Sequence, residues 1–261
     1  RSRMKIADLD SPEEVAIFQD LCSQLMEAGF TMDSDLSFLP LDLAEPTLED
    51  TMPDTERVLR AVERATGVAA QNIMMPYTVL KHLSWVLRES EFRVKCVISR
   101  DQVRILIRDI LPADNTDPIM GFALDLGTTS LAGVVVDLQT GKILAKASCG
   151  NGQIRYGADV INRIIESDKA GGRKRLQDAV VKESIIPMLA QMYRVSGINP
   201  RRIYRMVLAG NTTMNHLALG LYADPIRMEP FVPSFFHTDY LYVRDIDLKM
   251  NRLAELIVAP N

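Results

Sequence analysis

The sequence predicts an α/β protein in which a lobe over residues 116–261 follows a small α+β domain over residues 46–115. Two observations predict the lobe: three strands close together in sequence, and a later strand that leads directly into a helix. A third observation separates the domains, because residues 111–118 are polar and bracketed by prolines, as is typical of a hinge. Residues 1–45 remain as an N-terminal linker that contains an amphipathic helix.

The first two strands of the lobe flank a polar turn. The first strand, residues 122–126, is apolar apart from Asp125, so we expect it to be buried and Asp125 to need a partner there. The second strand continues to residue 136, and the third covers residues 142–148. Gly127 lets the backbone bend between the first two strands. The hydroxyls that follow the bend belong to Thr128, Thr129 and Ser130.

Hydroxyls and successive N–H groups at such a bend can hold a phosphate, and Asp125 can hold Mg²⁺ directly or through water. The alternative is an ordinary β-hairpin with a polar turn. The third strand favours the phosphate interpretation, because it makes the hairpin part of a larger sheet.

A second polar loop follows the predicted buried strand over residues 203–208 and precedes a helix over residues 214–220. Polar residues between a strand and a helix are well placed for phosphates or a reacting group. The alternative is that Asn211 or Thr212 only caps the helix. The candidate binding residues of this loop are Asn211, Thr212 and Thr213.

Asp159 is a candidate catalytic residue near the start of a helix predicted over residues 158–167. A carboxylate there also gains from the helix dipole without any catalytic role, so both interpretations stay open. In the catalytic interpretation, Gln153 and Arg155 face the phosphate cleft together with Asp159. A longer helix is predicted over residues 173–195 and should kink at Pro187.

The N-terminal part shows no cluster of catalytic residue types. A helix with one apolar stripe is predicted from Ser11 to Gly29, and it is a linker helix, a dimer contact with a second copy, or a lid on the next domain. In the small domain we expect helices over residues 54–67 and 77–89 and strands over residues 92–98 and 103–107. This domain is interpreted as a spacer or a docking unit.

Composition excludes several classes of protein. A hydrophobic fraction of 47% and a charged fraction of 25% are those of a globular protein with a core. The net charge of −4 gives no reason to expect nucleic-acid binding, and no apolar run approaches the length of a membrane span. Cys22, Cys96 and Cys149 lie far apart and cannot supply the four ligands of an iron–sulfur cluster. We expect small core cysteines in a cytoplasmic protein.

The polar turn resembles the first phosphate motif of the acetate and sugar kinase, Hsp70 and actin superfamily of ATPases. Within it, the chain is most similar to the ATP-dependent reductive activators of corrinoid proteins. The likeness rests on residues 122–132, 153–163 and 208–217, with Glu229-Pro-Phe231 after them. Upstream, residues 45–57 resemble the opening of that family's middle domain, so the resemblance spans nearly all of residues 45–261.

The resemblance implies a ribonuclease H-like first lobe of an actin/Hsp70-type ATPase, with Mg²⁺ and ATP phosphates at Asp125, Gly127, Thr128 and Thr129. Residues 211–213 would line the same cleft. Members of the family use ATP to drive an electron from an iron–sulfur cluster to a corrinoid protein of a methyltransferase system. This returns its cobalt from Co(II) to Co(I).

The chain departs from the family pattern in two ways. It contains no cysteine cluster, and it ends before a second phosphate motif or an adenosine loop, so we expect a fragment that binds ATP poorly by itself. Two rival functions stay open: a small-molecule kinase of the same superfamily, with Asp159 as the base, and a non-catalytic interaction module.

Overall fold

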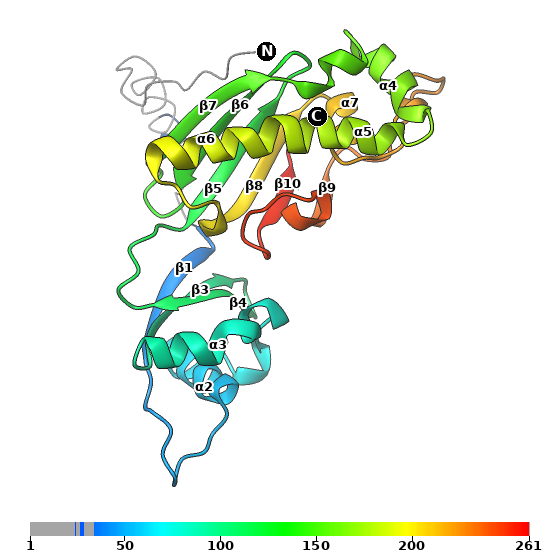
Figure 1. Cartoon of the computed structure of the whole chain (residues 1–261). Helices are drawn as coiled ribbons and strands as arrows, with labels where there is room; N and C mark the ends of the chain where they lie inside the picture. Colours follow the sequence, from blue (N-terminus) through cyan, green and yellow to red (C-terminus); the bar gives the residue numbers. More distant parts are fainter. Residues whose placement is uncertain (1–23, 25–26, 29–33, 261) are drawn as a thin grey trace. The chain divides into compact units, whose positions relative to one another are not determined.

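The computed structural model describes residues 24, 27–28 and 34–260, except for the side chains of residues 239 and 240. The chain divides into two units between Ile119 and Met120, and each has its own sheet (Figure 1). The helix predicted from Ser11 to Gly29 lies outside the described residues, apart from three of them.

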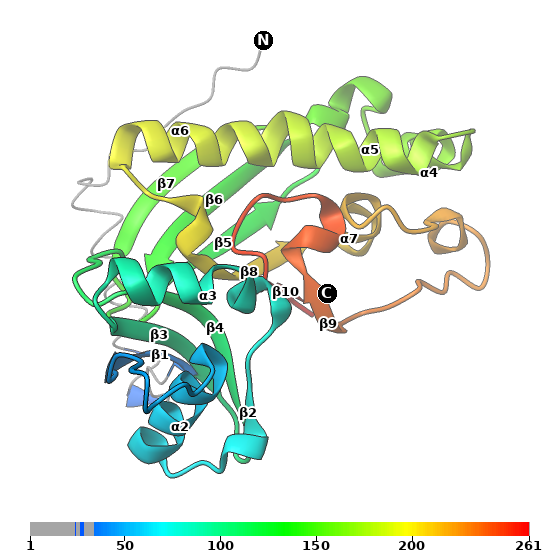
Figure 2. The ribbon, with the colours of Figure 1, turned by 60° about the horizontal axis from the view of Figure 1, so that its bottom comes forward.

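The smaller unit is a four-stranded sheet in the order β1-β3-β4-β2, packed against two helices (Figure 2). The helices α2 and α3 bury one apolar stripe each, including Val58 and Leu83, as their sequence patterns predict. The strands are β1 (Leu36–Asp42), β2 (Ile73–Met74), β3 (Arg93–Arg100) and β4 (Ile105–Pro112), and the helices are α2 (Asp54–Thr66) and α3 (Tyr77–Glu89).

The smaller unit begins earlier than residue 46, where the sequence had placed its start. Strand β1 pairs antiparallel with β3 from Leu36 opposite Ser99 to Asp42 opposite Arg93. Pro40 is accommodated because β1 is at the edge of its sheet, where a missing N–H costs no hydrogen bond to a neighbour. The segment predicted as an N-terminal linker over residues 1–45 therefore contributes a strand to this sheet.

The larger unit contains a six-stranded sheet in the order β7-β6-β5-β8-β10-β9. The strands β5, β6 and β7 form an antiparallel meander, and β8 runs parallel to β5 on its other side, with β10 parallel to β8. The predicted three-strand run and the strand that follows it are confirmed. The strands are β5 (Met120–Leu126), β6 (Ser130–Asp137), β7 (Ile143–Gly150), β8 (Ile203–Gly210), β9 (Thr238–Tyr242) and β10 (Glu255–Val258).

Strand β5 is buried on one face only. Phe122, Leu124 and Leu126 are each 1% exposed and belong to the core, whereas Ala123 and Asp125 are exposed on the opposite face. The expectation that the strand is buried throughout, with a buried carboxylate at Asp125, is therefore wrong. Alternation along the strand places Asp125 away from the core, so no buried partner is needed.

The long helix predicted over residues 173–195 is present, but it contains a wider turn. It runs as α5 (Gly172–Val180), a π-helical turn η3 (Val181–Ile185) and α6 (Ile186–Ser196) along one face of the sheet (Figures 1 and 2). The π turn comes directly before Pro187, whose ring has no N–H and would clash with a carbonyl one turn earlier in a regular α-helix. The helix accommodates Pro187 through this local widening, and the kink that the sequence predicted there stays a prediction.

The wider turn brings Ser184 against the loop after β7. Its hydroxyl accepts a hydrogen bond from the Gly152 N–H at 3.0 Å and donates to the Gly150 carbonyl at 3.2 Å. Ser184 is only 1% exposed, so its hydroxyl is shielded from water. The π turn thereby fixes the loop that precedes α4 (Val160–Asp168).

Ser184→Ala should lower the free energy of unfolding by about 1–3 kcal/mol, because it leaves the partly buried N–H of Gly152 without its acceptor. Urea unfolding followed by circular dichroism measures the change. Ser148→Ala is the matched control, since no hydrogen bond of that hydroxyl is found among the described residues. Equal unfolding midpoints for the two variants would contradict the role given to Ser184.

Candidate functional site

The turn between β5 and β6, residues 127–130, is closed tightly on itself. A Cβ atom at Gly127 would lie 2.6 Å from the carbonyl oxygen of Ser130, so only glycine fits without a shift of the backbone. Thr129 and Ser130 are exposed and Thr128 is partly exposed, which leaves their hydroxyls open to a ligand. The geometry requires glycine at the position that the sequence singled out.

The second predicted loop lies at the same edge of the sheet. Leu126 of β5 is in register with Gly210 of β8, so the parallel strands end side by side. Asn211 Nδ2 donates to Thr128 Oγ1 at 3.4 Å, which joins the two loops directly. The structure thus brings together the two groups of residues that were predicted as binding residues.

Asn211 also caps the helix α7 (Thr212–Ala218), as the alternative interpretation predicted. Its Oδ1 accepts the N–H of Met214 at 2.9 Å. Thr212 is partly exposed, but Thr213 is only 6% exposed and belongs to the interior. Capping by Oδ1 and the contact of Nδ2 with Thr128 use different atoms, so one residue serves both purposes.

Asn151, which the sequence interpretation missed, holds the turn over residues 127–130 through two hydrogen bonds to its carbonyl groups. It is 3% exposed, its Nδ2 donates to the Gly127 carbonyl at 2.9 Å, and its backbone N–H donates to the Thr129 carbonyl at 2.9 Å. Its Oδ1 accepts the N–H of Gln153. The only signal in the sequence was its position between two glycines directly after a strand.

Asp125 is exposed beside the turn, on the face of β5 opposite the core. Its neighbours in register are Ala132 on β6 and Ala209 on β8, whose small side chains leave the carboxylate unobstructed. Within the described part of the chain, Asp125 has no hydrogen bond or ion pair of its side chain. One free carboxylate is sufficient for Mg²⁺, which keeps several waters and is bound otherwise by phosphate oxygens.

Asp159 is the N-cap of α4. Its two oxygens accept hydrogen bonds from the backbone N–H and the Nδ2 of Asn162, both at 2.8 Å. Gln153 and Arg155 do not form a ligand-facing group with it. Gln153 is fully buried and donates to the Leu176 carbonyl, and Arg155 forms an ion pair with Glu183. The helix-start interpretation of Asp159 is confirmed, and its catalytic role stays a prediction.

The helix α7 is tied to the irregular segment after it through His216. This side chain is fully buried; its Nδ1 lies 2.7 Å from the Thr212 carbonyl, and its Nε2 accepts the N–H of Ser234 at 3.0 Å. Because a backbone N–H only donates, Nε2 carries no proton and Nδ1 is the donor. The ring also stacks on Phe235, with centroids 4.6 Å apart.

Burial lowers the pKa of His216 below its usual 6.5, against a smaller opposing effect of the Thr212 carbonyl. The unfolded chain therefore binds a proton at a higher pH than the folded chain. Above pH 6.5 His216 is neutral in both states, and the folded protein has its full stability. As the pH falls from 6.5 toward the lowered pKa, the free energy of unfolding decreases by up to about 1.4 kcal/mol per pH unit. Urea midpoints at pH 7.5 and 5.5 measure this, and His216→Gln should show a smaller difference between them.

The cysteines and acidic side chains that the structure describes do not form a metal cluster. Among the described residues, no group of three or more His, Cys, Asp or Glu side chains is placed to hold a metal ion. Cys96 is a core residue, as expected, and its burial raises the pKa of the thiol to about 12. Cys149 is partly buried, and burial raises the pKa of its thiol as well. Cys22 lies outside the described residues.

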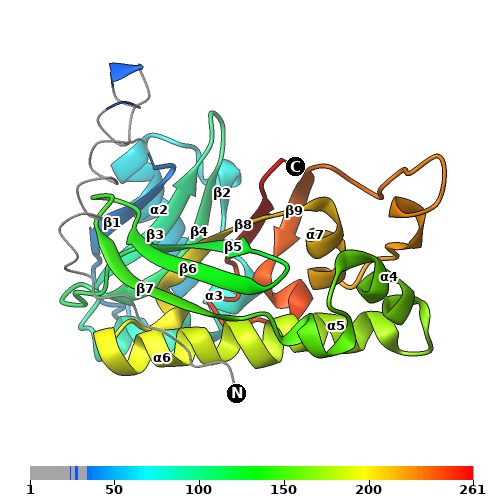
Figure 3. The same ribbon diagram turned by 90° about the horizontal axis from the view of Figure 1, so that it is seen from above.

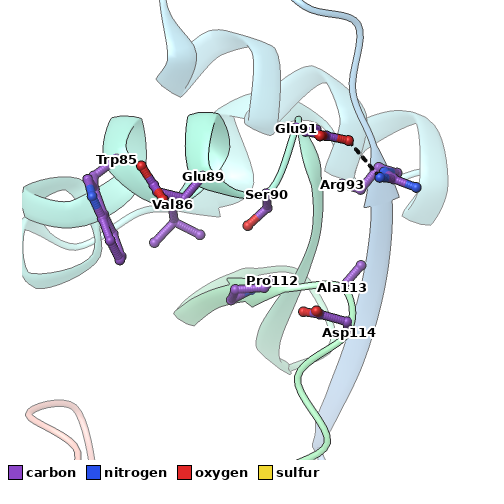
Figure 4. Close-up of a pocket in the computed structure, with 9 residues that line it drawn as sticks. All are labelled: Trp85, Val86, Glu89, Ser90, Glu91, Arg93, Pro112, Ala113 and Asp114. Carbon is purple, nitrogen blue, oxygen red and sulfur yellow. Dashed lines mark hydrogen bonds and ion pairs between the residues drawn. The ribbon is translucent and has the colours of Figure 1, made fainter.

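A hollow of about 450 Å³ lies in the smaller unit, between the end of α3 and the end of β4 (Figure 4). Trp85 and Glu89 line it from the helix, and Pro112 and Asp114 from the strand end. None of the predicted binding residues lines it. In the part of the chain that the structure describes, no helix is both long enough and apolar enough to cross a membrane.

Comparison with known proteins identifies the family. The RACo middle region matches residues 120–261, and the RACo linker region matches residues 26–117. The chain is 32% identical over 230 residues to the corrinoid activation enzyme RamQ of Eubacterium limosum, covering 85% of this chain and 37% of that protein. A solved structure of a reductive activator for a corrinoid, iron–sulfur protein superimposes with a TM-score of 0.72 at 30% identity. That match covers 89% of this chain and 36% of the other.

These matches confirm the resemblance to corrinoid activators and the α/β fold, and they correct one label. The small domain that the resemblance assigned to a middle domain corresponds to the linker region, and the larger unit is the middle region. The chain spans little more than a third of the length of either relative. It belongs to the RACo family and comprises the family's linker and middle regions.

Proposed function

We propose that the full-length protein is an ATPase that reductively reactivates a corrinoid protein, returning its cobalt from Co(II) to Co(I) by transfer of one electron. The observation that carries this proposal is the contact between Asn211 and Thr128. It joins two polar loops next to the exposed carboxylate of Asp125, in a chain that belongs to a family of corrinoid activators.

In this proposal the two loops hold the phosphates of ATP, and Asp125 holds the accompanying Mg²⁺ directly or through water. The N–H groups and hydroxyls of Gly127, Thr128, Thr129 and Ser130 face the phosphates, because those hydroxyls are open to solvent. Asn211 and Thr212 contribute from the second loop, and the buried Thr213 supports it from within. Bound Mg²⁺ neutralises phosphate charge and orients the phosphates.

The need for ATP follows from the redox chemistry. Co(I) lies at too low a potential for the reductant alone, so nucleotide must favour a conformation in which the cobalt is easier to reduce. The electron comes from an iron–sulfur cluster elsewhere in the full-length protein, which an external donor reloads. The partner is the corrinoid protein of a methyltransferase system, the protein works in the cytoplasm, and a homodimer is compatible with this role.

The geometry favours the activator over the kinase. A kinase needs a positioned base beside the γ-phosphate. Asp159, the predicted candidate, has both oxygens engaged by Asn162 at the start of α4. The interaction-module alternative assigns the work to the linker region and does not explain why the carboxylate of Asp125 is exposed beside the two polar loops.

ATP hydrolysis by the full-length protein, with and without a corrinoid protein in the Co(II) state, tests the proposal. We expect hydrolysis stimulated by the partner, together with the appearance of the Co(I) absorption spectrum. Turnover that depends on a sugar or an acid would instead identify a kinase. If no hydrolysis is seen under any condition, the non-catalytic interaction module is the remaining interpretation. The 261-residue fragment should bind ATP weakly in the same buffers.

A further inference from the structure

Arg163, on α4, is a fully buried cation without a counter-ion among the residues that the structure describes. The residue is 0% exposed. Its Nε donates to the Gly157 carbonyl at 2.9 Å, its Nη1 lies 3.3 Å from Met214 Sδ, and its Nη2 has no hydrogen-bond partner. No carboxylate of the described residues forms an ion pair with it. The neighbouring charge of Asp159 is exposed and engaged with Asn162.

A buried charge in this state is costly, because removal from water is compensated neither by an opposite charge nor by a full set of hydrogen bonds. Burial accordingly lowers the pKa of Arg163. The same chain shows the usual solution at Arg57, which is 5% exposed. Its Nη1 donates to Asp50 Oδ2 at 2.7 Å and to the Ala44 carbonyl at 3.0 Å. Arg163 has no such partner, although it is the more deeply buried of the two.

Arg163 lies close to the turn over residues 127–130, and this position explains why it has no carboxylate partner of the kind that Arg57 has. Met214 Sδ, which contacts its Nη1, also lies 3.8 Å from Asn151 Nδ2, and that same Nδ2 donates to the Gly127 carbonyl at 2.9 Å. Three successive contacts therefore lead from the guanidinium to the turn over residues 127–130. Together they span no more than the electrostatic screening length of about 10 Å at 0.1 M salt. The helices that carry Arg163 and Met214, α4 and α7, lie side by side (Figure 3).

We propose that Arg163 is a positioning residue that supplies the positive charge behind the phosphate site, so that the polyphosphate of the bound nucleotide is its missing counter-ion. The inference rests on the proposed function, because it takes the turn as the phosphate site. Arg163 acts through space and through Asn151 and Met214, and it does not touch the ligand. Its uncompensated charge is a cost of the empty protein that an anionic ligand relieves.

The experiment compares Arg163→Met and Arg163→Lys with the wild type in the full-length protein. Isothermal titration calorimetry gives the Kd for Mg·ATP and for inorganic tripolyphosphate, and thermal melts without ligand give the stability. We expect Arg163→Met to bind both ligands roughly 10- to 100-fold more weakly, and Arg163→Lys to recover most of the affinity. The ligand-free melting temperature of Arg163→Met should be no lower than that of the wild type, because an apolar side chain replaces an uncompensated charge.

Arg57→Met is the matched control, since it removes a buried arginine that is paired. It should melt at a lower temperature and leave both Kd values unchanged. A purely structural role for Arg163 predicts the same behaviour for Arg163→Met, and that result, or its failure to fold, would overturn the inference. Equal affinities of Arg163→Met and the wild type would overturn it as well, while leaving the ATP site intact. If the wild type binds neither ligand, the proposed function itself fails, and the inference fails with it.

Discussion

Asp125→Ala in the full-length protein is expected to abolish most Mg·ATP-dependent turnover while the fold stays unchanged. Loss of the metal's protein ligand removes several kcal/mol of charge stabilisation, which corresponds to about 10²-fold or more in rate. The carboxylate is exposed and makes no contact that the described structure depends on, so the free energy of unfolding should change by less than about 0.5 kcal/mol. Partner-stimulated phosphate release at saturating Mg²⁺ measures the rate, and thermal melts measure the stability.

Asp114→Ala provides the comparison, because Asp114 is also an exposed aspartate without an ion pair among the described residues, but lies in the linker region. The Asp114→Ala variant should hydrolyse ATP at the wild-type rate. Raised Mg²⁺ should partly restore activity if Asp125 is replaced by asparagine, which keeps one oxygen ligand. Wild-type turnover in Asp125→Ala would refute the metal role.

Gly127→Ala should weaken Mg·ATP binding about 10²-fold and destabilise the larger unit by about 1–3 kcal/mol. The added Cβ would lie 2.6 Å from the Ser130 carbonyl oxygen, and a backbone oxygen can move away only if the turn opens. Opening moves the N–H groups and hydroxyls of the turn away from the positions in which they would contact a phosphate. Even a small displacement of such groups weakens binding and slows catalysis. Calorimetric titration with Mg·ATP and urea unfolding measure the two effects.

Gly121→Ala, on strand β5 that leads into the turn, is the matched control for this steric argument. The Cβ there would approach the side-chain end of Leu138 at 2.7 Å, which can rotate away, rather than a backbone atom. Its effect on Mg·ATP binding should be too small to detect. If both variants bind Mg·ATP like the wild type, the turn is not the phosphate site.

Sequence patterns predicted the strands and helices whose partners are close in the chain. The meander of β5, β6 and β7 and the strand β8 were found in this way. Strands β1 and β10 were missed, because their burial depends on pairing with β3 and β8, which lie about fifty residues or more away along the chain. A short strand without such a neighbour has no distinctive alternation of its own.

Helix α4 shows why periodicity did not identify the buried side chains at the site. Its apolar positions include Ile161, Ile164 and Ile165, and periodicity alone does not say which of them is buried. In the structure Ile161 and Ile165 are 48% and 42% exposed, and Arg163 is fully buried beside Ile164. A pattern that assigns charges to the surface cannot find a buried arginine, since its burial depends on Met214 and Gly157 from other segments.

The two alanines beside Asp125 have a consequence for the ligand that this surface admits. A hexahydrated magnesium ion is several ångströms wide, and a side chain with branches at Ala132 or Ala209 would occupy the volume of its inner waters. The methyl groups present there contribute almost nothing to the core, as both lie on the exposed face. If Asp125 holds Mg²⁺ as proposed, the small size of these two side chains is what lets the ion keep its inner waters at the carboxylate.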